Sequence, residues 1–370
     1  MADFVIVGGG VYGCGVAWAL AQQGAEVVLL EANTIAAGAS GGLGKRGVRA
    51  NGRDVREMPL MKMAYEIWPV LHEILGADVG YERQGHLLLY ERPQEFVSAE
   101  AQLWMQNQQD IPTHLVERDE LHDIEPHLNP NIFAALHCPK DGIADHTATT
   151  KAYAQAAVTL GAEIRAEVAV TALAHDGERV TAVLTNTGER IPVGKQLLLM
   201  CNTFVPELVQ QQLGLTLPIW KMLPQVMLTQ KVDPMPLRHL IGHAHRVLAM
   251  KSHPTGQIMI SGGWRGRWNE QGQPETQPDQ VAGNFAEAVA TYPMLTNTAV
   301  AEADATRPET ICIDHIPIIG RLPAADNLLV ATGWSGHGWA IAPAVTQLLA
   351  DWALTGTQPA LLRPFGYDRF

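Results

Sequence analysis

Three glycines and one glutamate near the start of the chain have the types and spacing of a dinucleotide-binding loop. Gly8, Gly10 and Gly13 match the pattern GxGxxG, and Glu31 follows at roughly the 20-residue separation typical of such loops. The first glycine allows a tight turn, the second lets the backbone approach a pyrophosphate, and the third lets a helix pack closely on strands. A carboxylate at position 31 can accept a hydrogen bond from a ribose hydroxyl. It would repel a 2′-phosphate, which disfavours NADP.

The segments around these residues predict the elements that would hold them. Residues 4–7 are predicted to form a short buried strand, and residues 11–23 a helix that ends at Gly24. The segment AEVVLLE, which ends in Glu31, is predicted to form the second strand. The helix N-terminus would present unpaired N–H groups to a phosphate. This strand–loop–helix context favours a nucleotide site over a turn that serves only packing.

A second glycine-rich segment, residues 36–52, follows with the sequence AAGASGGLGKRGVRANG. It carries Ser40 and the basic residues Lys45, Arg46 and Arg49. An extended FAD needs backbone and hydroxyl contacts along its phosphates and beside its ring, whereas NAD enzymes seldom need such a loop. The alternative is a flexible surface loop with solvated basic residues.

A third glycine loop lies near the C-terminus. Residues 328–331 are predicted to form a buried strand, residues 333–338 a tight loop, and residues 341–352 a helix closed by Gly356. The N-terminus of that helix could face an anionic ligand such as reduced flavin, whose negative charge develops at N1 and the C2 carbonyl. One shared flavin accounts for glycine loops at both ends of the chain better than separate packing turns do.

Composition excludes several other classes of protein. Of the chain's residues, 47% are hydrophobic and 17% charged, which is typical of a globular protein. The length of 370 residues suggests two domains. Its net charge of -12 argues against nucleic-acid binding. The four cysteines lie far apart without a CxxC pair, which indicates neither a zinc ribbon nor a disulfide framework. No signal peptide or membrane span is recognisable, so a cytoplasmic protein is expected.

Four segments together resemble the D-amino-acid oxidase superfamily of FAD-dependent amine oxidoreductases. This superfamily includes glycine oxidase, sarcosine oxidase, and amino-acid and opine dehydrogenases. The segments are VIVGGGVYGCGVAWAL with Glu31, GASGGLGKRGVR, GERVTAVLTNTGERIPVGKQLLLM, and TRPETICIDHIPIIGRLPAADNLLVATGWSGHG. The last is the most diagnostic, because its Arg-Pro, Asp, Pro-Ile-Ile-Gly and glycine loop stand in family order.

The resemblance implies an α/β fold in which a Rossmann-like FAD-binding domain is interleaved with an α+β substrate domain built on an antiparallel sheet. The FAD-binding domain would take residues 1–85, 145–217 and 306–370. The substrate-binding domain would take residues 86–144 and 218–305, with strands such as GHLLLY, QVMLTQ and QIMISGGW. A homo-oligomer or a partner subunit is also compatible with the family.

The resemblance further implies the residues of the site. The expected FAD-binding residues, including a backbone contact to adenine near Val168, are Gly8, Gly10, Val11, Tyr12, Gly13, Glu31, Ala32, Ser40, Gly41, Gly42, Leu43, Val168, Gly333, Gly336, His337 and Gly338. The expected catalytic or substrate-contacting residues are Arg307, Arg46 and Arg49. Independently of the resemblance, Trp264 and Trp334 flank glycine loops and are candidates for lining a substrate pocket, with packing in the core as the alternative.

Arg307 is the sharpest of these expectations. In glycine-oxidase-like relatives the arginine of the matching Arg-Pro motif binds the substrate carboxylate, and a guanidinium offers that group a planar bidentate fork. The alternative is a structural ion pair with Asp304 or Asp314. Cys312 does not match the cysteine that attaches flavin covalently in some sarcosine oxidases, so dissociable FAD is expected.

The activity that the resemblance implies is oxidation of an amino acid or N-substituted amino acid. The substrate would be of the glycine, sarcosine, D-amino acid, proline or opine type. Hydride would pass from the amine-bearing carbon to flavin N5, and the imine would hydrolyse. The acceptor would be O2 or, in a dehydrogenase subunit, a partner or quinone. The strand ISGGW lacks a lysine of the kind that assists oxygen in sarcosine oxidases, which favours a dehydrogenase. An NAD-dependent dehydrogenase and a non-catalytic flavin-binding protein remain alternatives.

Two further features qualify the resemblance. Cys201, Asn202 and Thr203 stand where relatives usually carry a small-residue stretch with glycine, but asparagine tolerates left-handed backbone, so the turn should survive.

The segment RHLIGHAHR has histidine spacings suited to a metal, at His239, His243 and His245. No carboxylate or cysteine nearby completes the set, so no metal site is predicted. His337 is either a loop residue bonded to the backbone or a flavin-side residue.

Overall fold

The structure, a computed structural model, describes residues 2–40 and 44–370 of the chain. Its first sheet is mainly parallel, with strand order β22-β23-β12-β1-β2-β8. β22 pairs antiparallel with β23, and the other pairs are parallel. These strands are β1 (Phe4–Val7), β2 (Val27–Leu30), β8 (Glu163–Arg165), β12 (Gln196–Leu199), β22 (Ile318–Arg321) and β23 (Leu328–Thr332).

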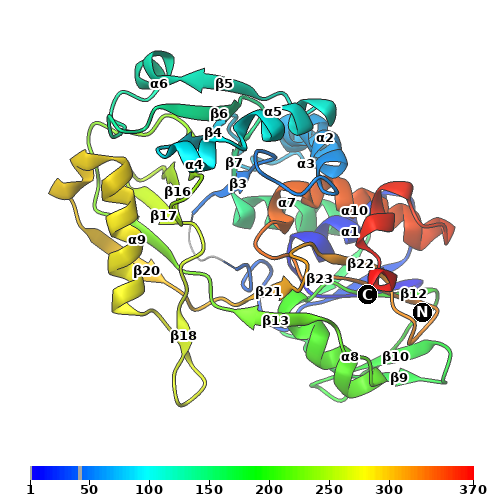
Figure 1. Cartoon of the computed structure of the whole chain (residues 1–370). Coiled ribbons are helices and arrows are strands. Elements are labelled where there is room, and N and C mark those ends of the chain that lie inside the picture. Colours follow the sequence, from blue (N-terminus) through cyan, green and yellow to red (C-terminus); the bar gives the residue numbers. More distant parts are fainter. Residues whose placement is uncertain (1, 41–43) are drawn as a thin grey trace.

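The first sheet is covered on both faces. β1, β2 and β12 are buried along their whole length, as strands between two layers must be. Figure 1 shows α1, α7 and α10 side by side, and these helices share one apolar core with α2. A small antiparallel sheet and α8 contribute to a second apolar core on the other face. The elements are α1 (Val11–Gln22), α2 (Met58–Ile67), α7 (His146–Thr159), α8 (Val205–Leu213), α10 (Gly338–Thr355), β9 (Val170–His175), β10 (Val180–Thr185) and β11 (Arg190–Pro192).

The second large sheet has strand order β20-β14-β17-β16-β15-β4-β6-β5. Its pairs are antiparallel except for β15 with β4. The helix α9 (Pro278–Thr291) packs on one face of this sheet. The strands are β4 (His86–Tyr90), β5 (His114–Glu117), β6 (Ala134–Cys138), β14 (Val226–Thr229), β15 (Leu240–His243), β16 (Ala249–Ser252), β17 (Ile258–Ser261) and β20 (Val300–Asp304).

Side-chain alternation gives the second sheet two different faces. Met250 and Ile260 belong to the apolar core beneath α9. Their chain neighbours Lys251 and Met259 therefore point to the opposite face. On that opposite face the sheet contacts the N-terminal loop region, because Leu240 approaches Gly47 there and Met259 approaches Gly44.

Short elements connect the two large sheets. The ribbon of β13 with β21 joins a strand from the expected substrate segment to one from the expected FAD segment, and the division into domains stays a prediction. The two-stranded ribbons pair β3 (Arg46–Val48) with β7 (Gly142–Ala144), β13 (Ile219–Met222) with β21 (Glu309–Cys312), and β18 (Arg267–Trp268) with β19 (Pro274–Glu275). The short helices are α3 (Leu71–Leu75), α4 (Pro93–Phe96), α5 (Ala99–Gln108), α6 (Arg118–Ile124), and the 3₁₀ turns Trp68–Val70, Asn202–Phe204, Pro293–Asn297, Ala360–Phe365 and Tyr367–Arg369.

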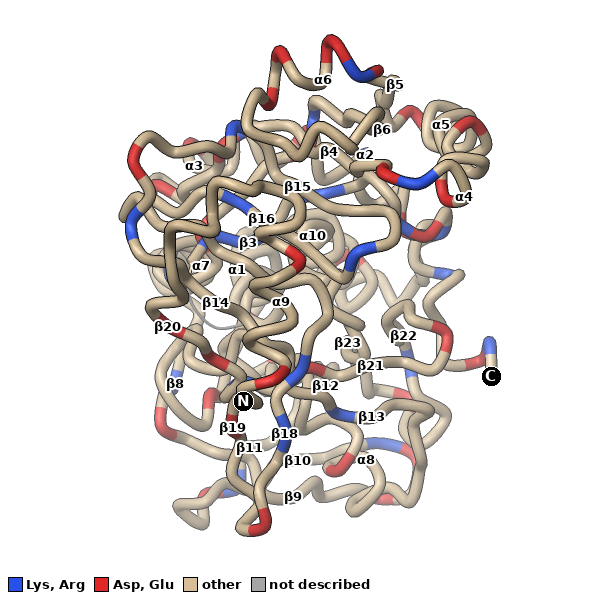
Figure 2. The backbone as a smooth tube through the Cα atoms, turned by 60° about the vertical axis from the view of Figure 1, so that its left-hand side comes forward, with Lys and Arg blue, Asp and Glu red and all other residues tan. Residues whose placement is uncertain are grey.

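The structure confirms the expected fold class and most of the local predictions. β1, α1 and β2 lie within a residue or two of their predicted bounds. The predicted start of the last helix is wrong, because α10 begins at Gly338 and continues through Pro343. Along the backbone in Figure 2, acidic positions are mixed with basic ones. Among the helices that the structure describes, none is long and apolar enough to cross a membrane.

Candidate cofactor and substrate site

The first glycine loop has the geometry that its sequence predicts. Gly8 has φ of +112°, and a Cβ there would lie 2.8 Å from the backbone of Cys201. A Cβ on Gly13 would lie 1.8 Å from the Gly8 carbonyl oxygen, so this glycine lets α1 pack against the loop. A Cβ on Gly10 would meet no atom within 4 Å. The loop is therefore closed on its inner side and open at Gly10.

The N-terminus of α1 begins at this opening. Gly10 is the N-cap residue and supplies no side-chain hydrogen bond to the first turn. The N–H groups of such a turn, together with the helix dipole, attract an anion. Open space and uncapped N–H groups at one place fit a bound pyrophosphate.

Glu31 is tied to the loop that it follows. Its Oε2 accepts a hydrogen bond from the Gly9 N–H at 2.6 Å, and its Oε1 accepts one from Asn33 at 2.8 Å. The Val168 N–H donates to the Glu31 carbonyl at 2.9 Å. The structure thus brings the expected ribose-binding and adenine-binding positions together, with Ala32 between Glu31 and Asn33 in the chain.

The second glycine loop is fastened at Ser40 and at Arg46. The Ser40 hydroxyl donates to Glu309 Oε2 at 2.6 Å. The Arg46 guanidinium donates to the carbonyls of Ser40, at 3.0 Å, and Gly44, at 3.3 Å. Arg46 therefore links the backbone of Ser40 to that of Gly44. The predicted contacts at positions 41–43 (Gly41, Gly42 and Leu43) lie outside the described residues.

Glu309 is a buried hub that the sequence reasoning missed. Besides Ser40, it accepts hydrogen bonds from the Asn202 amide and the Thr310 N–H, both at 2.8 Å. Thr310 in turn donates its hydroxyl to Asn202 and accepts the Gly333 N–H at 3.0 Å. Burial raises the pKa of Glu309. This network joins the second loop, the turn after β12, β21 and the C-terminal loop.

The turn at Asn202 confirms the expectation that asparagine can replace glycine there. Asn202 has φ of +39°, in the left-handed region. Its side chain also makes two of the hub contacts, which glycine could not make. The available signal for Glu309 was a lone acidic residue in the otherwise uncharged strand ETIC, two positions after Arg307.

We expect Glu309→Ala to loosen the loops around the cofactor. One buried and two partly buried donors would lose their acceptor, and breaking such a network costs about 3 kcal/mol of folding free energy. The melting temperature without ligand and its rise on adding FAD should both fall. Glu178→Ala, at an exposed position, is the control and should leave both values unchanged. Native stability together with native FAD affinity in the Glu309→Ala variant would contradict the hub.

The first and third glycine loops are in direct contact. The ring of Tyr12 stacks on that of Trp334 with centroids 3.8 Å apart and planes 9° apart, and the Tyr12 hydroxyl donates to the Gly338 carbonyl. Gly333 and Gly336 have positive φ values, as their tight loop requires. Trp334 is buried in the core, a position that favours packing between the loops over contact with a substrate.

Arg49, Arg53 and His337 form a neighbouring polar group. Arg53 donates to the His337 carbonyl at 2.7 Å, and Glu57 Oε2 lies 3.9 Å from His337 Nδ1. Burial lowers the pKa of His337, and the positive charge of Arg53 lowers it further. The same two causes, in the same order, lower the pKa of Arg49 to about 10. Arg49 donates to the Asn51 carbonyl. His337 takes part in this group through its backbone carbonyl, and its role beside the flavin stays a prediction.

Arg307 has a free guanidinium in the part of the chain that the structure describes. It is half-buried between β20 and β21, and its side chain makes no hydrogen bond or ion pair with a described residue. Asp304 accepts hydrogen bonds from Thr306, and Asp314 pairs with Arg369 at 2.9 Å. The structural ion pair considered above is therefore absent among these residues.

Trp264 lies on the other side of the second sheet. Its indole N–H donates to the Val247 carbonyl at 2.7 Å. A Cβ on Gly283 of α9 would lie 2.4 Å from its ring, so the indole packs against α9. The structure gives no support to the prediction that Trp264 lines a substrate pocket.

The histidine-rich segment has a carboxylate nearby that the sequence did not reveal. Ligand atoms of Glu91, His243 and His245 lie within 4.8 Å of one another, so the premise that nothing completes the set is wrong. However, Arg246 donates to Glu91 Oε2 from Nε at 2.9 Å and from Nη2 at 2.7 Å. The backbone N–H groups of His245 and Arg246 point at His243 Nδ1. This pattern favours a carboxylate–guanidinium cluster, and the absence of a metal stays a prediction.

Comparison with known proteins places these features in a wider group. The sequence model of a family described as "FAD dependent oxidoreductase" (DAO) matches residues 3–352. The 4-methylaminobutanoate oxidase (formaldehyde-forming) of Paenarthrobacter nicotinovorans is 25% identical over 95% of this chain and 44% of that protein. Sarcosine oxidase subunit beta of an Arthrobacter species is 25% identical over 100% of this chain and 91% of that protein.

A solved structure shares the whole fold. The L-proline dehydrogenase from P. horikoshii superposes with a TM-score of 0.87 at 24% identity, covering 100% of this chain and 97% of that one. The chain spans about half the length of the first curated relatives that it matches.

Proposed function

The chain belongs to the DAO family of FAD-dependent oxidoreductases, and on this premise we propose that it oxidises an amino acid or an N-substituted amino acid. The observation that carries the proposal is the guanidinium of Arg307, which is unpaired among the described residues. It stands two residues from Glu309, which holds the second glycine loop through Ser40. A guanidinium that has no ion-pair partner beside the second glycine loop suits the carboxylate of an amino-acid substrate.

The residues present fit an extended dinucleotide. Gly10 and the first turn of α1 would hold the pyrophosphate, Glu31 and Val168 the adenosine part, and Ser40 the region nearer the ring. The proposal includes dissociable FAD. Burial raises the pKa of Cys312 to about 11, which leaves little thiolate for covalent attachment.

The chain's own residues would bind and orient the substrate. Bound FAD supplies the acceptor for a hydride from the carbon that bears the neutral amine. Arg307 would hold the carboxylate through two parallel hydrogen bonds, and Pro308 restricts the backbone of Arg307 to extended geometry. The substrate loses a hydride and a proton. Water then converts the imine into an oxo acid and an amine.

A dehydrogenase subunit that passes electrons to a partner or quinone is the second candidate. The similarity to a sarcosine oxidase subunit favours it, since that name describes one chain of an assembly. Homo-oligomer formation is also part of the proposal. All four cysteines are free, in keeping with the proposed cytoplasmic location.

Anaerobic titration of the yellow protein tests the function. We expect the flavin colour to bleach with at least one of glycine, sarcosine, proline, a D-amino acid or an opine. Bleaching by none of them would contradict amine oxidation, and a purified protein without flavin absorbance would favour an NAD-dependent dehydrogenase. Hydrogen peroxide formed in step with substrate consumption would identify O2 as the acceptor.

A further inference from the structure

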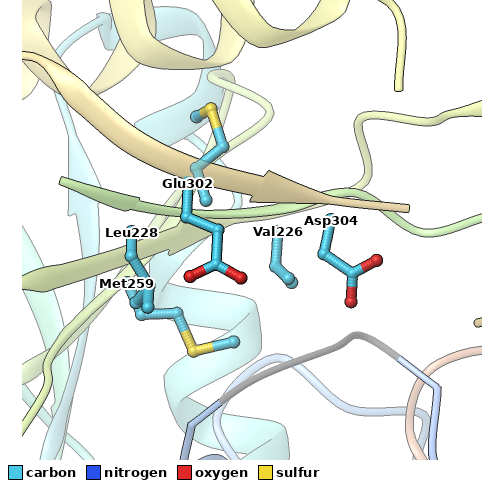
Figure 3. A pocket seen from close by; sticks show the side chains of 6 residues that line it. Val226, Leu228, Met259, Glu302 and Asp304 are labelled. Carbon is cyan, nitrogen blue, oxygen red and sulfur yellow. The ribbon is translucent and has the colours of Figure 1, made fainter. Parts of the chain in front are cut away.

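Lys251 is buried on the face of the second sheet that meets the glycine loops. It lies on β16, directly across from Met259 on β17, and its residue is 5% exposed. A Cβ on Gly44 would lie 3.3 Å from the Met259 sulfur, so the second glycine loop lies against this part of the sheet. In Figure 3, Met259 lies near Val226 and Leu228. Lys251 is therefore buried on the sheet face that lies against the second glycine loop, the loop expected to hold the flavin.

Lys251 has no partner for its charge among residues 2–40 and 44–370. It makes no hydrogen bond or ion pair there, and the charged group that acts on it is another cation, Arg46. Burial and then Arg46 lower the pKa of Lys251 to about 7. The acidic residues Glu302 and Asp304, labelled in Figure 3, lie on β20, three strands away. An uncompensated buried ammonium is costly, and a ligand anion would offset that cost.

The neighbouring cations are already accounted for. Arg46 donates to the carbonyls of the second glycine loop, and its own pKa is lowered first by burial and then by Arg307. Arg307 is assigned to the carboxylate beside the amine. Within the described part of the chain, Lys251 therefore remains as a second cation without an anion, and both it and Arg307 interact electrostatically with Arg46.

From this arrangement, and resting on the function proposed above, we propose that Lys251 binds a second carboxylate of the substrate. The native substrate would then be an amine with two carboxylates, one held by Arg307 and the other by Lys251. A compact ammonium group suits a carboxylate oxygen as a point charge, whereas a neutral or cationic substrate tail would leave it uncompensated.

Matched probes that differ by one carboxylate test this proposal. The reactive pair is sarcosine and iminodiacetate, and the unreactive pair is methylthioacetate and thiodiacetate, in which sulfur replaces the amine nitrogen. Binding of the unreactive pair is measured from the change in flavin absorbance. We expect the native protein to bind thiodiacetate about tenfold or more tightly than methylthioacetate, as one charge-assisted hydrogen bond provides.

Variants at Lys251 should remove that preference selectively. Lys251→Met should weaken thiodiacetate about tenfold and leave methylthioacetate unchanged, while Lys251→Arg should retain part of the preference. Because the methionine removes a buried charge, it should also raise the melting temperature of the ligand-free protein. Lys231→Met, at an exposed lysine, is the control and should change none of these values.

The outcomes separate the two proposals. Equal binding of the two thioethers by the native protein would overturn the role of Lys251, even if sarcosine bleaches the flavin. An equal loss of affinity for both thioethers in the Lys251→Met variant would overturn it as well. The same holds if this variant keeps the native preference for thiodiacetate and instead shows slower reoxidation of the flavin by O2. Failure of every amine to bleach the flavin would instead remove the proposed function, and the substrate class with it.

Discussion

Replacing Arg307 with lysine is expected to lower kcat/KM by on the order of a hundredfold, equivalent to about 3 kcal/mol of charge-assisted hydrogen bonding. Lysine keeps the positive charge but cannot offer two parallel donors to one carboxylate. FAD should stay bound, since the side chain of Arg307 touches none of the described loop contacts. Steady-state kinetics with the amine that bleaches the flavin fastest measures the loss.

The same substitution should leave stability unchanged. The guanidinium has no ion pair to lose within the described residues, because Asp314 is held by Arg369. A normal melting temperature would therefore separate a kinetic loss from misfolding. Arg321→Lys, at an exposed position, serves as the control. If Arg307→Ala retains native efficiency, this residue does not anchor the carboxylate, and an amine without a carboxylate becomes the leading substrate.

Gly10→Ala is expected to weaken FAD binding on the order of 10- to 100-fold without destabilising the protein. The new methyl group would meet no protein atom within 4 Å, and the native φ of −80° suits alanine. It would instead occupy the space assigned to the pyrophosphate, where crowding costs about 1–3 kcal/mol. The melting temperature without FAD should match that of the native protein, while titration with FAD reveals the weaker affinity.

Gly13→Ala provides the contrast. Its methyl group would lie 1.8 Å from the Gly8 carbonyl oxygen, so the helix and the loop would have to separate. This variant should lose stability and FAD together. Native FAD affinity in Gly10→Ala would show that the pyrophosphate does not approach this residue, and the fit of the first loop would fail.

Local patterns predicted the parts of the fold that local interactions determine. The run FVIV, the three glycines and the following small residues specify β1, the loop and α1 within adjacent segments. The start of α10 was harder to predict, since no Ser, Thr, Asp or Asn caps it and Pro343 lies inside it. Helix ends with weak caps are decided by packing, which a single sequence does not display.

The site depends on contacts that cross the whole chain. Glu309 and Ser40 meet across 269 residues, and Tyr12 and Gly338 across 326, so neither contact has a local signal. Trp264 follows Gly262 and Gly263, whose φ values of +127° and +124° change the direction of the chain. The alternation of side chains along β17 therefore does not continue to Trp264, and the sequence could not predict on which side of the sheet its ring lies. Glu91 reaches the histidine segment because β4 pairs with β15.

The central place of β1 has a consequence for how the protein is made. β1 ends at Val7, yet one of its two neighbours, β12, begins only at Gln196. At a translation rate of 5–20 residues per second, roughly 10–40 s pass before that neighbour exists. During this time an apolar strand edge stays exposed on the nascent chain, where it can aggregate or recruit a chaperone. The backbone of Cys201 also closes the first loop, so this loop can take its final form around a cofactor only after residue 201 has left the ribosome.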